Sequence, residues 1–285
     1  MSGATVTTKP DTIVMIHGLW MTPRSWERWK ERYEDRGYKV LAPPWPGFES
    51  EVEGLNADPS PMEDLGADEV IDHYDILIRE LPSTPIIMGH SLGGSISQVL
   101  LDRGLGCVGV GIASATVKGV RDLPLSTLKA AGKVLNPLKR GKPVPFTEKE
   151  FLYAFANTMT PEESKPLYER YAVPAASGVL ADIALANLRR HPPTEIDFAK
   201  EGRIPLLFVG FGEDHVVPPR ATRHNERRYD TPSRSPSTGS SRGARTSPAR
   251  LDGKRWPTSR STGRSGTLAC RSRTMPGRAT RRRRD

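Results

Sequence analysis

The sequence of 285 residues has little of what secreted and membrane-spanning proteins need. It contains two cysteines, Cys107 and Cys270, which are too few for a disulfide framework. No apolar run reaches the ~18 residues that a membrane-spanning helix requires. The N-terminal residues have no charged segment followed by an apolar stretch and a cleavage site, so we expect no signal peptide. These absences favour a reducing, cytoplasmic location.

Acidic and large apolar residues are scarce at the C-terminal end. Residues 231–285 hold 14 Arg and one Lys but only two Asp, a net charge of +13; since the whole chain carries +9, residues 1–230 carry −4. This tail has no Val, Ile, Phe or Tyr, and we expect it to be disordered. A natural basic tail would attract anionic partners by charge alone. Specific nucleic-acid recognition is not supported, because Trp256 is its one aromatic residue.

The rest of the chain alternates short apolar runs with amphipathic stretches, which is typical of a parallel sheet covered by helices. Residues 43–61, rich in Pro, Gly and Glu, predict a loop. We divide the chain into a first core part (11–116), a helical cap insertion without convincing strands (117–200), a second core part (201–230) and the tail (231–285). The expected strands are 12–16, 38–42, 85–89, 107–114 and 204–210. The expected helices are 22–37, 62–81, 92–103, 125–135, 147–157, 161–171, 178–190 and one from about 219.

The motif GHSLGG at residues 89–94 lies between an apolar strand and a helix. A G-x-S-x-G turn in this context is a nucleophile elbow, which would make Ser91 a catalytic nucleophile. The alternative is a glycine-rich turn with an incidental serine. The backbone N–H groups of Leu92, at the helix start, and Leu19, after His17-Gly18, would form an oxyanion hole. We expect the His17 side chain only to support its loop.

Three ordered motifs resemble the α/β-hydrolase fold, in particular small bacterial esterases, lipases and haloperoxidase-like proteins. They are IVMIHGLW at 13–20, PIIMGHSLGG at 85–94 and PLLFVGFGEDHVVP at 205–218, and the resemblance covers about residues 11–228. It implies a doubly wound, mostly parallel sheet and no metal or organic cofactor. It also implies that Asp214 is the catalytic acid, with Glu213 the weaker candidate. The alternative for Asp214 is a helix cap.

The resemblance also implies a catalytic histidine one strand after the acid, and no histidine follows His224. His215 is adjacent to Asp214, which is poor geometry for a triad, and His224 falls inside a helix; both are weak candidates, so the base is unknown. Read two bases later with GC-rich codons, the tail can encode a strand (233–241), His-Phe (245–247) and an amphipathic helix (254–265). We therefore hypothesise a frameshifted end of a hydrolase gene.

The predicted function is hydrolysis of carboxylic esters of small or lipid-like apolar molecules through an acyl-enzyme on Ser91. Loss of the histidine would impair this chain or inactivate it. The alternative is a non-catalytic module that kept the fold and binds a ligand or partner. The oligomeric state is not indicated. Large apolar residues in the cap, most of them aromatic, suggest an apolar substrate face, although a core role is the more common one. They are Phe146, Phe151, Tyr153, Phe155, Met159 and Tyr168.

Overall fold

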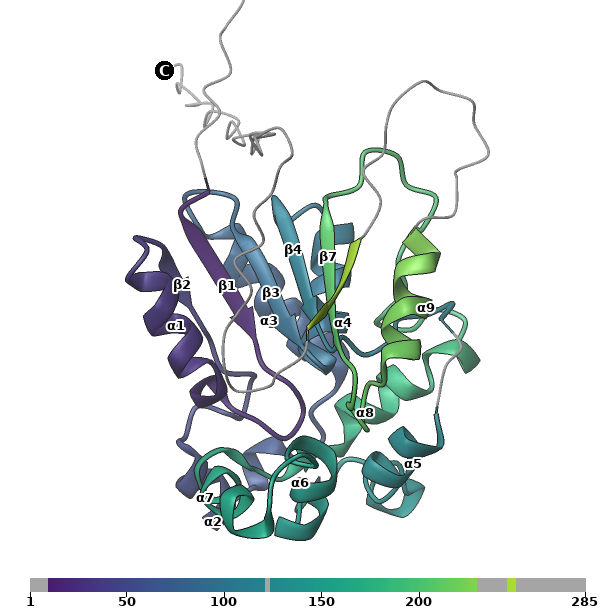
Figure 1. Cartoon of the computed structure of the whole chain (residues 1–285). Coiled ribbons are helices and arrows are strands. Elements are labelled where there is room, and N and C mark those ends of the chain that lie inside the picture. Colours follow the sequence, from purple (N-terminus) through teal and green to yellow (C-terminus); the bar gives the residue numbers. More distant parts are fainter. Residues whose placement is uncertain (1–9, 121–123, 230–244, 250–285) are drawn as a thin grey trace, which may run out of the picture.

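A parallel sheet forms the centre of the molecule (Figure 1). The computed structural model describes residues 10–120, 124–229 and 245–249. Within them the strand order is β2-β1-β3-β4-β7-β8, with every neighbouring pair parallel. This confirms the expected doubly wound α/β class. The strands are β1 (Thr12–Ile16), β2 (Lys39–Leu41), β3 (Ile86–His90), β4 (Val108–Ile112), β7 (Leu206–Phe211) and β8 (Arg245–Ala249).

Alternation along β1 shows how the two faces of the sheet are covered. Val14 and Ile16 enter the main core, whereas Ile13 and Met15 pack with Trp26 on the other face, as the period of two in a strand requires. The main core also receives α3 and α4. The helices of this part are η1 (Pro23–Trp26), α1 (Glu27–Glu34), α2 (Val52–Ala57), η2 (Ser60–Met62), α3 (Ala67–Arg79), α4 (Leu92–Asp102) and α9 (Pro219–Tyr229).

The segment between β4 and β7 holds a group of short helices. In Figure 1, α5, α6 and α7 lie beyond the carboxyl ends of the strands, and α7 lies beside α2. No helix in the described part of the chain is long and apolar enough to cross a membrane. The elements of this segment are α5 (Leu125–Ala131), η3 (Pro137–Lys139), β5 (Pro143–Val144), α6 (Glu148–Phe155), α7 (Pro161–Tyr171), β6 (Ala175–Ala176), α8 (Ser177–Ala184) and η4 (Ala186–Leu188).

Two expectations about regular structure before residue 230 were wrong. The predicted loop 43–61 contains α2, which buries Val52 and Leu55 and whose Asn56 side chain donates to the Ala172 carbonyl at 2.8 Å. The segment 117–200 contains two short strands, because β5 pairs antiparallel with β6. Both features depend on contacts with distant parts of the chain, and local sequence patterns do not carry that information.

Of the tail predicted to be disordered and to lack a last strand, 231–285, the structure describes residues 245–249 alone. This segment forms β8, which pairs in parallel with β7 over Leu207–Phe211. An open sheet edge presents unpaired backbone N–H and C=O groups, and an extended segment can pair with them whatever its side chains are. The rest of the tail, and with it the remainder of that prediction, lies outside the described residues.

Candidate active site

Ser91 occupies the sharp turn between β3 and α4. Its backbone angles are φ 53° and ψ −119°, a conformation that non-glycine residues rarely adopt. The turn is tight because α4 begins at the next residue and crosses close to the end of β1. A Cβ on Gly93 would lie 2.2 Å from the Ile16 carbonyl oxygen, so only glycine fits there. A strained residue between a strand and a helix, with glycine at the close approach, is the arrangement that the sequence predicts for a nucleophile elbow.

Backbone hydrogen bonds from three segments hold Ser91 in this conformation. Its N–H donates to the Ile112 carbonyl at the end of β4, at 3.0 Å. Its carbonyl accepts from Gly94 N in α4 and from Ala115 N in the loop after β4, both at 2.9 Å. The position of the serine is therefore set by the packing of β4 and α4 around it.

The loop 17–19 lies directly beside the elbow. A Cβ on Gly18 would be 3.1 Å from the Ser91 Cβ and 3.2 Å from the His90 Nδ1. Leu92 is the first residue of α4, and its N–H therefore has no acceptor within the helix. The structure thus brings the Leu19 and Leu92 backbone segments to the serine, where the sequence predicts an oxyanion hole.

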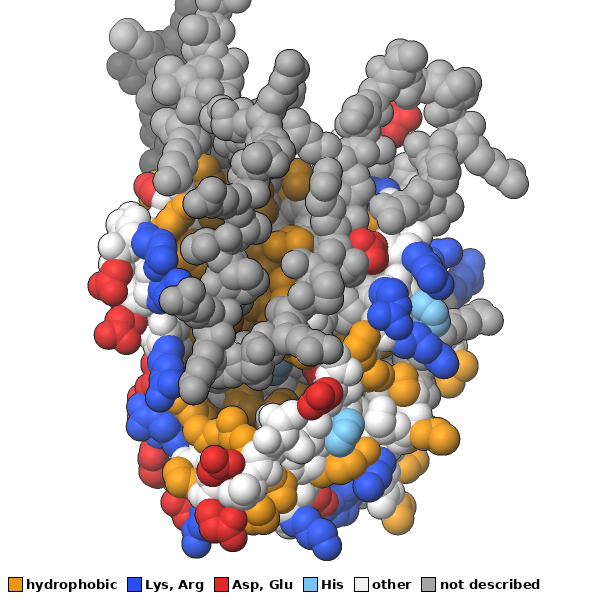
Figure 2. Space-filling view, viewed as in Figure 1, with side chains coloured by type: hydrophobic (Ala, Val, Ile, Leu, Met, Phe, Trp, Pro, Cys, Tyr) orange, Lys and Arg blue, Asp and Glu red, His pale blue; other side chains and the backbone are white. Residues whose placement is uncertain are grey.

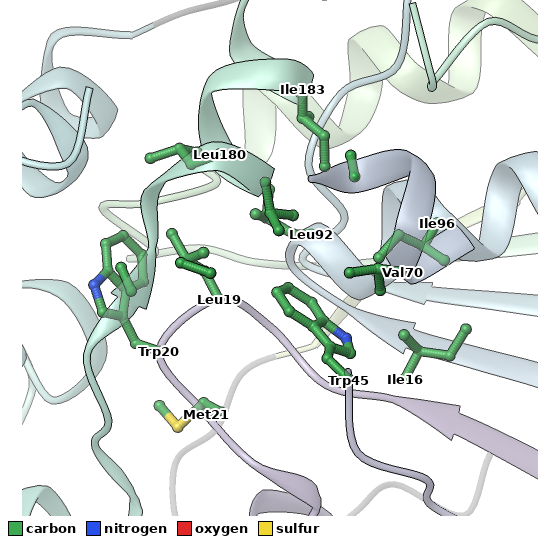
Figure 3. Close-up of a cluster of buried hydrophobic side chains, with 14 of the residues drawn as sticks. Ile16, Leu19, Trp20, Met21, Trp45, Val70, Leu92, Ile96, Leu180 and Ile183 are labelled. Atoms are coloured by element: carbon green, nitrogen blue, oxygen red, sulfur yellow. The ribbon is translucent and has the colours of Figure 1, made fainter. Parts of the chain in front are cut away.

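The side chains of Leu19 and Leu92 fix that backbone from the other side. Both are buried in the main core with Trp45, and Leu180 of α8 joins the same cluster. Figure 3 shows Leu19 and Leu92 next to each other, with Leu180 and Ile183 reaching them from α8. Shifts of the two N–H groups would disturb this packing.

Asp214 follows β7 in a short loop, facing the same cavity as the serine. Its Oδ1 accepts from Val216 N and Val217 N, both at 2.8 Å. Burial raises the pKa of this carboxyl above its ordinary value, while the two backbone hydrogen bonds and the neighbouring His215 oppose the shift. The side chain also bonds to its own loop, so the structure is compatible with the capping alternative as well as with a catalytic acid.

A cavity of about 650 Å³ joins the two residues. Ser91, Asp214 and Glu213 line it together, and α6 and the turn after it supply a further wall. That wall includes Asn157, whose Nδ2 donates to the Glu213 carbonyl at 2.9 Å. No local pattern in the sequence points to Asn157, because its approach to the acid loop depends on how α6 packs. The apolar lining residues are Ala113, Ala154, Phe155, Phe211, Val216 and Val217.

The chain matches one known protein family. The model of the Alpha/beta hydrolase family matches residues 13–249. The chain belongs to the alpha/beta hydrolase family. The comparison with curated protein sequences found no match.

Solved structures of other alpha/beta hydrolases have the same fold. An extracellular alpha/beta-hydrolase from a Paenibacillus species has 16% identity and a TM-score of 0.60, over 85% of this chain and 91% of that one. The monoacylglycerol lipase of Paleococcus ferrophilus has 18% identity and a TM-score of 0.56, over 85% and 86%. A methylesterase from Arabidopsis has 15% identity and a TM-score of 0.53, over 78% and 86%.

Two histidines of this alpha/beta hydrolase lie beside Ser91 and are neutral at pH 7: His17 is buried and His90 is half-buried. Burial lowers the pKa of both His17 and His90 to about 4. The His17 ring stacks on the Trp45 ring with 4.7 Å between centroids. Its Nε2 accepts a hydrogen bond from the backbone N–H of Trp45 at 3.3 Å. Its Nδ1 then carries the proton and donates to the Gly18 carbonyl at 3.0 Å. His17 therefore braces its loop, and neither ring has the pKa near 7 that suits a general base.

The two weak candidates for the base are not among the residues that line the cavity. His215 stacks on Tyr153, with 4.5 Å between ring centroids, and its Nδ1 lies 2.8 Å from the Tyr153 carbonyl oxygen. His224 lies on α9. Among the described residues that line the cavity, His90 is the one histidine. The structure thus brings Ser91 and Asp214 to one cavity, but it places neither His215 nor His224 in the lining.

Proposed function

We propose that this hydrolase fold is built for hydrolysis of carboxylic esters with Ser91 as the nucleophile. The observation that carries the proposal is the strained elbow at Ser91, which lines one cavity with the carboxylate of Asp214. The apolar lining, Phe155 and Phe211 among it, favours small or lipid-like apolar acyl or alcohol groups. The neighbouring structures include a lipase and a methylesterase by name, which supports the same chemistry.

The reaction would proceed by acyl transfer to water. The Ser91 Oγ attacks the ester carbonyl while an imidazole takes its proton, and the N–H groups of Leu19 and Leu92 stabilise the oxyanion. The imidazolium then protonates the departing alcohol, which leaves an acyl-enzyme on Ser91. Water, deprotonated by the same imidazole, then attacks the acyl carbonyl, and the imidazolium returns the proton to the Ser91 Oγ as the acid is released. Asp214 would hold the imidazole in the correct tautomer.

The imidazole is the missing part of this scheme. We infer that it belongs to the alternative reading frame of the tail, which can encode a histidine at 245–247 between a strand and a helix. A short strand, β8, stands at this edge of the sheet. We accordingly propose that residues 117–200 form a cap over the cavity and that residues 231–285 are a frameshifted end.

The two-cysteine composition favours a cytoplasmic enzyme. The cavity favours a small-molecule ester as its substrate.

The proposal is tested by substituting Ser91 in a chain with the alternative frame restored after Pro232. Ser91→Ala should lower hydrolysis of a short p-nitrophenyl ester by about 10⁴-fold or more, because the acyl-enzyme cannot form. The melting temperature should stay within a few degrees of that of the parent, which shows that the fold is kept. Full activity of the variant would refute the assignment of Ser91.

A non-catalytic ligand-binding module is the second candidate. It is favoured because His90, whose pKa is lowered to about 4, is the one histidine among the described residues that line the cavity. A fluorophosphonate probe, applied to this chain and to the chain with the restored frame, separates the two. Covalent labelling that disappears in Ser91→Ala supports an assembled nucleophile. Folded protein that remains unlabelled, in both frames, supports the binding module.

A further inference from the structure

One face of α5 and the turn after it is apolar but exposed. Leu125 and Leu138 are 84% and 87% exposed, and Leu128 is exposed as well. Leu125 and Leu128 share a helix face because they are three residues apart. The opposite face carries Ala130 and Ala131, which are buried. Large apolar side chains that stay exposed along one short segment indicate an interaction site.

The same segment is strongly basic. Residues 125–142 contain five Lys and Arg residues and no Asp or Glu. Two of these side chains form ion pairs with acidic residues of other elements. Lys133 Nζ lies 3.4 Å from Glu150 Oε2, and Arg140 Nη2 lies 3.3 Å from Asp182 Oδ1. In Figure 2, hydrophobic and basic side chains adjoin in the lower right part of the view, where Figure 1 places α5. We call the exposed residues of this segment the α5–η3 surface and define it by Leu125, Leu128, Lys129, Leu138 and Lys142.

We propose that the α5–η3 surface docks on an anionic lipid surface. Exposed leucines next to lysines are the combination that binds at the interface of an anionic bilayer, because the leucines enter the acyl boundary and the lysines meet the headgroups. A second copy of this chain would bring the same positive charge to the contact. A nucleic acid would bind the lysines through its phosphates and leave the leucines exposed, so it does not account for them. The basic C-terminal segment of this chain does not suit the surface either, because its charge has the same sign as that of the lysines.

The position of the surface suits a hydrolase of apolar esters. On its inner side, Thr127 Oγ1 of α5 donates to the Val216 carbonyl at 2.7 Å. Val216 lines the cavity that contains Ser91. Docking through the outer side of α5 therefore sets the cavity close to the lipid. The proposal does not rest on the ester chemistry, since binding to vesicles is measured without turnover.

The experiment is flotation of the full chain with vesicles of phosphatidylcholine alone or mixed with phosphatidylglycerol. We expect binding to the mixed vesicles that weakens with salt. The double variant Leu125→Ser/Leu138→Ser should bind at least about tenfold more weakly, because two apolar anchors are removed. Lys129→Gln/Lys142→Gln should bind more weakly and with a smaller salt dependence. The C-terminal charge is identical in all variants, so differences among them report the α5–η3 surface.

The matched control is Ile76→Ser, which removes an apolar side chain that is 61% exposed on α3, outside this surface. It should bind as the parent does, and all variants should keep the melting temperature because the changed side chains are exposed. Equal binding of the leucine variant and the parent would overturn the proposal and leave general charge as the cause. A dimer in size-exclusion chromatography that dissociates in the leucine variant would also overturn it, in favour of a second copy.

Discussion

Ser91 has a strained backbone conformation that its hydrogen bonds stabilise. A non-glycine residue with positive φ costs about 1–3 kcal/mol. The strain is offset by the hydrogen bonds from Ser91 to Ile112, Gly94 and Ala115, each contributing about 0.5–1.5 kcal/mol. Ala113, at φ 42°, is strained in the same way one strand further along, on the loop that closes around the serine. Strain that persists at two adjacent turns is a common sign of a functional site.

At the same scale, Asp214 gives a pH-dependent prediction. Its pKa in the folded chain is raised above the ordinary value of 3.8, mainly by burial. Ionisation of this carboxyl therefore costs stability, and the cost is absent below pH 3.8 and develops as the pH rises from there towards the folded-state pKa. Asp214→Asn keeps an oxygen that can accept from Val216 and Val217. It should thus raise the melting temperature at pH 7 but not at pH 3.

The same substitution separates a catalytic acid from a helix cap. In the chain with the restored frame, Asp214→Asn should lower kcat by about 10⁴-fold, since an asparagine leaves the imidazole in the wrong tautomer. Glu213→Gln is the matched control and should leave kcat nearly unchanged. Loss confined to KM in Asp214→Asn, or an equal loss in Glu213→Gln, would point to another acid.

Among the elements, α6 divides its aromatic residues between two tasks. Phe151 is buried in the main core and contacts Tyr168, with ring centroids 5.7 Å apart. Phe155, one turn later, lines the cavity. The sequence pattern left open whether these aromatics form core or substrate surface, and the answer differs from one residue to the next. Met159, beyond the helix, is exposed.

This division leads to a prediction for a pair of variants. Phe155→Ala should widen the cavity and shift the preference towards longer acyl chains, measured as kcat/KM over a series of p-nitrophenyl esters with the restored frame. Phe151→Ala should instead lower the free energy of unfolding by about 3–5 kcal/mol, with little change of preference. A uniform loss over all esters in Phe155→Ala, together with a lower melting temperature, would assign Phe155 to the core as well.

At the scale of the whole molecule, charge and site are segregated. The net charge of −4 on residues 1–230 contrasts with +13 on the tail, and Ser91 and Asp214 belong to the acidic part. The cavity needs a base that the described residues do not supply, since His90 is the one histidine in its lining and its pKa is lowered to about 4. Oxyanion stabilisation and binding alone accelerate such reactions far less than a complete triad does.

The prediction at this scale is that the given chain is a slow hydrolase or an inactive one. We expect the chain with the restored frame to hydrolyse a short p-nitrophenyl ester at least about 10³-fold faster, because it regains an imidazole. Resequencing the gene near codon 233 tests the hypothesis independently. Equal rates of the two chains would reject the frameshift account of function, and His215→Ala and His224→Ala would then identify the base.

The sequence by itself determined the class of fold, the strand order in the chain and the two loops that carry Ser91 and Asp214. These features have local signals: continuous apolar runs for buried parallel strands, and glycines where α4 meets β3. Even the boundaries of α4 and α7 follow from local pattern, as in Thr160-Pro161, where a capping threonine precedes a proline in the first turn.

Only the tertiary structure decided which residues meet. That α2 forms within a Pro- and Gly-rich stretch follows from burial of Val52 and Leu55 in the core. That β8 forms in a segment without large apolar residues follows from the open edge of β7, where backbone groups pair irrespective of side chains. Which face of α6 lines the cavity and which enters the core depends on packing between segments far apart in the chain, and a short stretch of sequence contains no record of its distant neighbours.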